Sequence, residues 1–499
     1  MMKKYLIFNK SVLCRPLSFV DDKNNSKVIE LSKEEATRYV EELNQINGEE
    51  LFFYMEREEW MNRLQLSDFS DQMDIECRKI MDSPELKGIR ESICKEIDKN
   101  INGFMIPFEV DNNEEYERKL KEKLAAFIRE IDRPAFRKEE VLVEDVKSIC
   151  KKVIDAFEAA KNGKAETAEK IVADILEEYK QYSFAVSELD QSYAFRGMAP
   201  FNDLRQNWVS KEEYEKMMEG ELNFFRARAE EENDIVREVK DIIYLPYSKR
   251  CNAKDLRFSS KGKVCLYLGV TSYVCSKECR WNGKDNLYLA SFKFNEKGKK
   301  KKILNLVVLQ SLLNGMISID EKISNHRELH NAMIRIFPLV IATMFTIRTS
   351  DEERAEKYGE KIKYEYLLSQ VLMNTLQKVG IDGVAYLSRQ GKDDFQYPQM
   401  VCLAIPITGT SEKDEYGELI NNFIVTKPVK YNGIENSELY ERRSYINEKY
   451  PMYLPQLCGG IKNCNAKVDY NGKTVFYQDT EFSKMDDYLI NQLHEKFII

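Results

Sequence analysis

The spacing of apolar residues changes along the chain and predicts two kinds of structure. Between about residues 31 and 185, apolar residues recur three and four positions apart among charged ones, as on one face of a helix. Such stretches are 34–47, 115–131 and 143–182. Within this region, "SKEE" predicts a capping box between Ser32 and Glu35. Gly163 in "KNGKAE" predicts a turn between two antiparallel helices.

From about residue 190 onward, strand-like runs lie between loops rich in Gly, Asn, Asp and Lys. The predicted strands are 223–229, 263–270, 286–294, 301–309, 382–388 and 400–407. Helices are predicted at 331–347 and 365–380, and a strand followed by a helix at 472–497. Strands and helices that mix without strict alternation predict an α+β fold.

The change in pattern predicts three parts. Residues 1–185 are interpreted as a helical regulatory or interaction domain, because they group no catalytic residue types. Residues 186–430 form the predicted catalytic domain, and 431–499 a C-terminal extension that packs on it.

Composition narrows the class of protein. The chain has 499 residues, of which 43% are hydrophobic and 32% charged, as in highly charged globular proteins. A net charge of -8 gives no general attraction to nucleic acid or anionic membranes. The apolar run near the N-terminus is too short for a signal peptide, and no stretch is long enough to span a bilayer. A cytoplasmic protein with reduced cysteines is therefore predicted.

Histidine is scarce, which excludes several kinds of catalysis. The three histidines are His326, His330 and His494, so Ser-His-Asp and Cys-His sites find little support. The "HRELH" segment is not HExxH, since its glutamate is misplaced for the base role. No Walker motif and no GxGxxG occurs.

Four cysteines invite comparison with a zinc site. They are Cys251, Cys265, Cys275 and Cys279, and no C-x2-C pair occurs among them. Buried free cysteine behaves as a small apolar residue. We therefore expect these cysteines to pack rather than bind metal.

Arginines, aromatic residues and one glutamate remain as candidates for chemistry. Arg226 and Arg228 in "NFFRARAE" fall on the same side of an extended strand, because side chains alternate. Arg257 follows in "DLRF". The stretch "KVCLYLGVTSYVCSKECRW" reads as a strand and a short helix that carry Tyr267 and Glu278.

A distal strand completes the set. In "DGVAYLSR", Tyr386 and Ser388 alternate onto one face. Read in order, "FFRAR", "LRF", "LYLG", "SKE" and "DGVAYLSR" resemble the RES domain family, and so does the placement of Gln370. The resemblance covers about residues 190 to 410. This chain departs from the family in a long interval before Arg257, in "CSKE" where Thr-Ala-x-x-Glu is usual, and in "FSSKGK".

The resemblance implies an ADP-ribosyltransferase-like mixed β-sheet with helices and an enzyme that degrades NAD+. Characterised relatives are often toxins held in check by an antitoxin partner, and some use phosphate as acceptor. It implies catalytic roles for Glu278, Arg226 and Ser388. Arginine's planar fork suits a diphosphate, and aromatic rings suit base stacking. The residues implied to bind NAD+ are Arg228, Arg257, Tyr267, Tyr386 and Phe225.

The resemblance implies that NAD+ is the substrate and that inorganic phosphate is a possible co-substrate. No metal or further cofactor is expected. Phosphorolysis and hydrolysis both stay open, as do an inhibitory or activating protein partner and a homo-oligomer. Two other readings use the same site: ADP-ribosyl transfer onto a macromolecule, and a non-catalytic NAD+ or nucleotide sensor. Without the family resemblance, the fallback is a two-part interaction protein.

Overall fold

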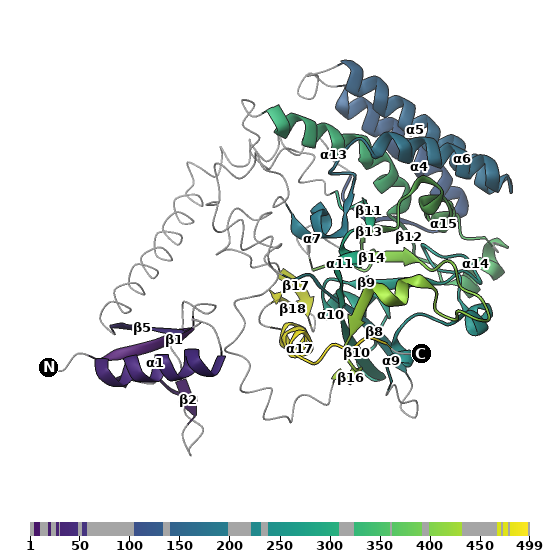
Figure 1. The fold of residues 1–499 in the computed structure, drawn as a ribbon. Helices are drawn as coiled ribbons and strands as arrows, with labels where there is room; N and C mark the ends of the chain where they lie inside the picture. Colours follow the sequence, from purple (N-terminus) through teal and green to yellow (C-terminus); the bar gives the residue numbers. More distant parts are fainter. Residues whose placement is uncertain are drawn as a thin grey trace. The chain divides into compact units, whose positions relative to one another are not determined.

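The structure is a computed structural model of the 499-residue chain (Figure 1). It describes residues 4–9, 18–20, 26–28, 30–47, 52–56, 104–132, 140–197, 221–230, 238–308, 324–359, 362–391, 399–431, 467–470, 473–477 and 480–497. The chain divides into two compact units: residues 1–99 with 441–450, and residues 100–440 with 451–499.

The first unit contains a small antiparallel sheet and one helix. Its strands are β1 (Tyr5–Asn9), β4 (Glu30–Leu31) and β5 (Phe52–Glu56), in the order β4-β1-β5. Two short strands, β2 (Ser18–Val20) and β3 (Ser26–Val28), pair separately. Helix α1 (Lys33–Asn47) begins with the predicted capping box, which is confirmed. The Ser32 amide donates to Glu35 Oε2 at 2.9 Å, and the Glu35 amide donates to Ser32 Oγ at 3.3 Å.

The second unit is built on a nine-stranded mixed sheet, in the order β15-β10-β8-β9-β14-β13-β11-β7, with β16 pairing β10. Its strands are β7 (Val186–Glu188), β8 (Asn223–Glu230), β9 (Cys265–Gly269), β10 (Asn286–Phe294), β11 (Lys302–Asn305), β13 (Gly383–Leu387), β14 (Val401–Pro406), β15 (Phe423–Val425) and β16 (Val429–Lys430). Among the described strands of this sheet, β11 and β13 form the one parallel pair.

The ladder is nearly broken in the middle of this sheet. Strands β8 and β10 pair along their whole lengths, whereas β8 and β9 share the single register pair Phe225↔Gly269. Backbone groups beside this point need other partners, because unpaired buried peptide groups are strongly unfavourable. The junction therefore offers polar backbone atoms to side chains.

A layer of helices packs at the β11 and β13 side of the sheet (Figure 1). It comprises α4 (Asn113–Ile131), α5 (Glu140–Lys161), α6 (Ala165–Tyr179), α13 (Ser324–Thr343), α14 (Asp351–Tyr358) and α15 (Tyr364–Leu376). The predicted turn between α5 and α6 is confirmed, with Gly163 at φ +73°. Buried Tyr116 and Tyr179 donate to carbonyls of α13, at 3.1 Å to Ala342 and 2.6 Å to Arg335. Helices α4 to α6 thus share a core with α13, and the predicted boundary at 185 stays a prediction.

A buried ion pair joins three of these helices. Arg354 and Glu365 are 3% and 5% exposed, and Arg354 Nη1 lies 3.0 Å from Glu365 Oε1. Arg354 Nη2 also donates to Asn113 Oδ1 at 2.8 Å. The Asn113 side chain in turn donates to the Ile362 carbonyl at 2.8 Å. Each charge is therefore paired and hydrogen-bonded, as a buried ion pair requires.

Smaller elements complete the second unit. Helix α17 (Glu481–Ile490) packs against α10 (Ser272–Glu278), and the hairpin of β17 (Lys467–Tyr470) and β18 (Lys473–Phe476) precedes α17 in the chain. The remaining helices are α7 (Tyr193–Arg196), α9 (Val239–Ile242) and α11 (Glu296–Lys299). Short 3₁₀ turns are η1 (Leu189–Gln191), η3 (Tyr247–Asn252), η4 (Gln377–Val379) and η6 (Glu418–Asn422).

The predicted α+β fold class is confirmed, and one predicted helix is too long. The prediction ran a helix over 331–347, but α13 ends at Thr343 and 345–347 form strand β12 (Phe345–Ile347). This strand pairs in parallel with β6 (Phe108–Val110), a pairing that local periodicity does not reveal. Among the residues that the structure describes, no helix combines the length and apolarity needed to cross a membrane.

Candidate functional site

Strand β9 and helix α10 together place Glu278. Thr271 caps the helix: its hydroxyl accepts from the Val274 amide at 3.1 Å and donates to the Gln399 carbonyl at 2.9 Å. At Gly269 a Cβ atom would lie only 2.4 Å from Val274 Cγ1. The glycine of "LYLG" therefore lets the helix pack closely against the end of the strand. Glu278 is the last residue of α10, and its side chain reaches an exposed position.

Cysteines anchor this helix to the neighbouring strand. Cys275 Sγ donates to the Phe225 carbonyl at 3.1 Å, and Cys279 Sγ donates to the Ala227 carbonyl at 3.4 Å. Burial raises the pKa of Cys279 to about 11 and that of Cys275 well above its usual value, so both thiols stay protonated and donate. These contacts satisfy carbonyls of β8 beside the gap in the ladder.

Metal-ligating residue types do not gather in this region. Across the described part of the chain, no group of three or more His, Cys, Asp and Glu side chains could hold a metal ion. Cys251 is exposed, whereas Cys265 is buried at the far end of β9. His326 and His330 both lie in α13, but the side chain of His326 is outside the described residues.

The Glu278 side chain is hydrogen-bonded to Ser388, which lies 110 positions away in the sequence. Ser388 is 3% exposed and directly follows β13. Its hydroxyl donates to Glu278 Oε1 in a short hydrogen bond, and its Oγ accepts from the Gln390 amide at 3.1 Å. A carboxylate at the surface is thereby held by a buried hydroxyl.

Arg257 lies behind this pair in a largely buried position. Its guanidinium carbon is 4.7 Å from the ring centre of Phe258 and 4.8 Å from that of Tyr386. Nη1 donates to the Leu387 carbonyl at 3.0 Å, while the buried Nε has no hydrogen-bond partner among the described residues. Burial and the nearby Arg389 lower the pKa of Arg257, and Tyr386 and Glu278 counteract them. An anion close to Arg257 would offset this burial.

Arg226 bridges the gap between β8 and β9. Its Nη1 donates to the Tyr267 carbonyl at 2.9 Å, where the ladder provides no backbone partner. The Tyr267 hydroxyl lies 2.9 Å from Ser259 Oγ. Burial raises the pKa of Tyr267 and of Tyr386 well above the usual range, so both rings stay neutral. The structure thus brings Ser388 into contact with Glu278, and Arg257, Tyr267 and Tyr386 lie close enough to interact with it electrostatically. Arg226 joins this group through the Tyr267 carbonyl.

Two predicted residues lie elsewhere. Arg228 forms an ion pair with Glu230 and donates from Nη1 to the Asp241 carbonyl at 2.6 Å, with 48% of its side chain exposed. The ring of Phe225 is buried in the core at 1% exposure. Neither contacts the Glu278 and Ser388 pair in any described interaction.

The Gln370 side chain is hydrogen-bonded to the residues just before Arg257. Its Nε2 donates to Asp255 Oδ1 at 2.7 Å and to the Leu256 carbonyl at 3.0 Å. The glutamine noted in the sequence therefore supports the site from α15.

Two features near the site were not singled out from the sequence. Arg389 donates to the Phe345 carbonyl and stacks 5.1 Å from the ring centre of Tyr366; its position next to Ser388 was the available signal. Asp486 of α17 accepts from the Ser272 amide at 2.8 Å and so covers the first turn of α10. No local pattern marks Asp486, because the contact joins residues 214 positions apart.

The chain is similar to a protein of Bacillus subtilis (strain 168) described as "Putative toxin YopC", with 26% identity over 276 residues. The match covers 54% of this chain and 56% of that relative, so the chain spans about half of the relative's length. No family model matches the chain, and no solved structure matches it.

Proposed function

We propose that this protein cleaves the nicotinamide–ribose bond of NAD+ at Glu278 and Ser388. The observation that carries the proposal is their hydrogen bond, formed by residues 110 positions apart, with two buried or half-buried arginines and two tyrosines beside it. The same residue types in the same order carry the resemblance to RES domains. The proposed fold of residues 186–430 is accordingly ADP-ribosyltransferase-like.

The arginines and aromatic rings suit the substrate's anionic and flat parts. Arg257 is a buried cation with an unpartnered Nε, and a diphosphate oxygen would supply the missing acceptor. Arg226 holds Tyr267 through its carbonyl, so its role includes positioning the tyrosine. The half-buried ring of Tyr267 offers a stacking surface, whereas Tyr386 is 3% exposed and holds Arg257 and Phe258 in place.

Glu278 supplies negative charge where the reaction develops positive charge. As the C1′–N bond breaks, its electron pair leaves with nicotinamide, which becomes neutral, and the ribose gains oxocarbenium character. A carboxylate stabilises that cation, and the C-terminal carbonyls of α10 add partial negative charge at the same place. The Ser388 hydroxyl orients the carboxylate. Phosphate then bonds to C1′ through an anionic oxygen, or water bonds to C1′ and releases its extra proton to solvent. Since nicotinamide leaves as a neutral group, no histidine acid is needed.

The relative called a toxin supports a biological setting for this activity. A protein that consumes NAD+ would act as a toxin or defence effector, and a protein partner would restrain or activate it. We propose this role for the chain together with the activity.

The activity is tested directly by incubating the purified full chain with NAD+, with and without phosphate, and measuring nicotinamide release. Glu278→Gln should release nicotinamide about 100-fold more slowly or worse, the usual effect of removing a charge-stabilising group. Glu412→Gln, a change at an exposed glutamate elsewhere, should match wild type. No release by wild type, or equal release by Glu278→Gln, would refute the proposal.

NAD+ labelled on the ADP-ribose part separates the alternatives. A labelled ADP-ribose that carries an added phosphate at C1′ indicates phosphorolysis, and labelled free ADP-ribose indicates hydrolysis. Label on protein or nucleic acid would replace the proposal with ADP-ribosyl transfer. Binding of NAD+ without any nicotinamide release would replace it with a sensor.

A further inference from the structure

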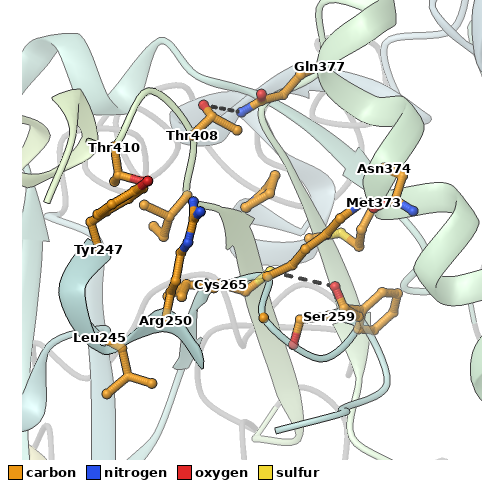
Figure 2. Close-up of a pocket in the computed structure, with 16 residues that line it drawn as sticks. Leu245, Tyr247, Arg250, Ser259, Cys265, Met373, Asn374, Gln377, Thr408 and Thr410 are labelled. Carbon is orange, nitrogen blue, oxygen red and sulfur yellow. Dashed lines mark hydrogen bonds between the residues drawn. The ribbon is translucent and has the colours of Figure 1, made fainter. Parts of the chain in front are cut away.

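A cavity of about 280 Å³ lies at the opposite end of β9 from Glu278 (Figure 2). Cys265, the first residue of β9, lines it, and so does Pro406, the last residue of β14. Gly269, where α10 packs, is four residues further along the strand. At about 3.3 Å per residue the two ends of β9 are roughly 13 Å apart. The cavity is therefore distinct from the Glu278 and Ser388 pair.

The charge of the cavity favours an anion. Arg250 and Lys263 line it, and no Asp or Glu is among its described lining residues. Neither cation forms an ion pair with a described carboxylate; Lys263 Nζ instead donates to the amide oxygen of Asn374 at 2.5 Å. Figure 2 shows the guanidinium of Arg250 pointing into the space between the surrounding side chains. A pair of uncompensated cations in a protein of net charge -8 marks a local anion site.

The walls also provide flat surfaces and hydrogen-bonding edges. The Arg250 guanidinium carbon lies 4.0 Å from the ring centre of Tyr247, a stacked pair to which an aromatic base could add. Phe258 contributes a second ring. Gln377 donates from Nε2 to Thr408 Oγ1 at 3.0 Å. The side-chain oxygen of Gln377 takes no part in that hydrogen bond. The lining is thus a mixture of apolar and polar side chains, and the polar ones can fix the orientation of a ring-bearing ligand.

Size and thiol chemistry limit what the cavity does. Its volume lies at the lower end of the range for small-molecule sites, which suits a mononucleotide better than a dinucleotide. Burial raises the pKa of Cys265 to about 12, so its thiol stays protonated and is a poor nucleophile. The cavity is therefore suited to reversible binding.

We propose that this cavity is a second ligand site that binds a nucleoside monophosphate, with its phosphate on Arg250 and Lys263 and its base against Tyr247. Nothing in the reaction proposed for Glu278 requires this site. The binding proposal stands on the cavity's own residues.

The turn 256–259 connects this cavity to the site around Glu278. Phe258 lines the cavity, and its ring centre is 4.5 Å from that of Tyr386. Ser259 also lines the cavity and shares a hydrogen bond with the Tyr267 hydroxyl. Arg257 belongs to the same turn and packs against the Phe258 ring. It donates to the carbonyl of Leu387, the residue before Ser388. A bound nucleotide that shifts this turn would alter the rate of NAD+ cleavage; this coupling rests on the proposed function.

The binding is tested by calorimetric titration of adenosine monophosphate into the full chain at low salt. Arg250→Gln and Lys263→Gln should each weaken binding at least tenfold. Lys249→Gln and Lys261→Gln change exposed lysines next to the lining residues and should bind as wild type. Absence of binding to wild type at millimolar nucleotide, or unchanged binding by Arg250→Gln, would overturn the site.

Further titrations test which class of ligand binds and whether the cavity is separate from the site around Glu278. Adenosine and inorganic phosphate should each bind at least tenfold more weakly than the nucleotide; phosphate binding of equal strength would overturn the role of the ring. In Glu278→Gln, saturating NAD+ should leave the nucleotide site able to bind one equivalent of nucleotide, and competitive displacement of the nucleotide by NAD+ would show one shared site.

The coupling has its own readout. Adenosine monophosphate should change the rate of nicotinamide release at least twofold in wild type and not in Arg250→Gln; an unchanged wild-type rate would refute the coupling. If wild type releases no nicotinamide at all, the proposed function fails while the titration still decides the binding site.

Discussion

Two buried arginines in the same unit have opposite surroundings. Arg354, in the helical layer, faces the Glu365 carboxylate and the Asn113 side chain, and both of its terminal nitrogens have acceptors. Arg257, beside Glu278, donates to one carbonyl and lies 3.1 Å from the Met344 sulfur, while its Nε is unpartnered among the described residues. A fully partnered buried cation supports the fold, and we propose that the incompletely partnered one takes part in binding the substrate. The difference suggests how structural and functional charges can be told apart.

The largest expected loss of stability comes from removing the carboxylate that pairs with Arg354. Glu365→Ala should lower the free energy of unfolding by about 3–5 kcal/mol, because Arg354 would stay buried without its counter-charge. Denaturant unfolding followed by circular dichroism measures this loss. Glu122→Ala, which removes an exposed partner of Arg118, should change stability by no more than about 0.5 kcal/mol. Equal losses in the two variants would contradict the comparison.

A substitution of Arg257, the incompletely partnered cation, should lower activity strongly and leave stability nearly unchanged. Arg257→Met keeps the apolar contacts with Phe258 and Tyr386 but removes the charge. We expect nicotinamide release to fall about 100-fold, close to 3 kcal/mol of transition-state stabilisation. Thermal unfolding should show a stability change within about 1 kcal/mol, since an apolar side chain of similar length fills the site. Arg118→Met on the surface of α4 serves as the matched control for both readouts. A loss of stability as large as that of Glu365→Ala would place Arg257 among the structural charges.

A third effect tests the helix that covers α10. Asp487 of α17 is 7% exposed, and burial together with Asp486 raises its pKa to about 8. The folded protein therefore holds a proton that the unfolded chain releases between about pH 4 and 8, and stability falls as pH rises through this window. Asp487→Asn should equal wild type below about pH 4 and exceed it by about 5 kcal/mol at pH 8, since the pKa is raised by about four units and each unit corresponds to about 1.36 kcal/mol. Unfolding curves at several pH values measure this; a constant difference across the window would contradict the raised pKa.

The smallest effect concerns the cysteines. Cys279→Ala should lower stability by only about 0.5 kcal/mol, because it removes one partly buried sulfur and a long hydrogen bond to the Ala227 carbonyl. A metal chelator should leave the melting temperature of wild type unchanged. If the chelator lowers that temperature in wild type and not in Cys279→Ala, a metal site must replace the packing role.

The individual elements were largely predictable because their signals are local. Strand β10 spans the residues that were predicted, and α1 begins at the expected capping box. Periodicity failed at 345–347, where three residues that continue an apolar helical pattern pair instead with β6, more than 200 positions earlier. Tertiary pairing overrode the local preference there.

The candidate site was predictable as a set of residues but not as an arrangement. Arg226 and Arg228 alternate onto the same side of β8, yet Arg226 bridges to Tyr267 while Arg228 pairs with Glu230. Alternation fixes the face of a strand, and neighbours decide where a long side chain goes.

The sequence by itself determined most helices and strands of the second unit, the face on which each candidate side chain lies, and the resemblance on which the proposed chemistry rests. Only the tertiary structure decided that Glu278 meets Ser388, that Arg257 is buried without a full set of partners, and that α17 covers α10. The physical reason is range. Periodicity and capping act within a few residues, whereas these contacts depend on the packing of segments more than 100 positions apart.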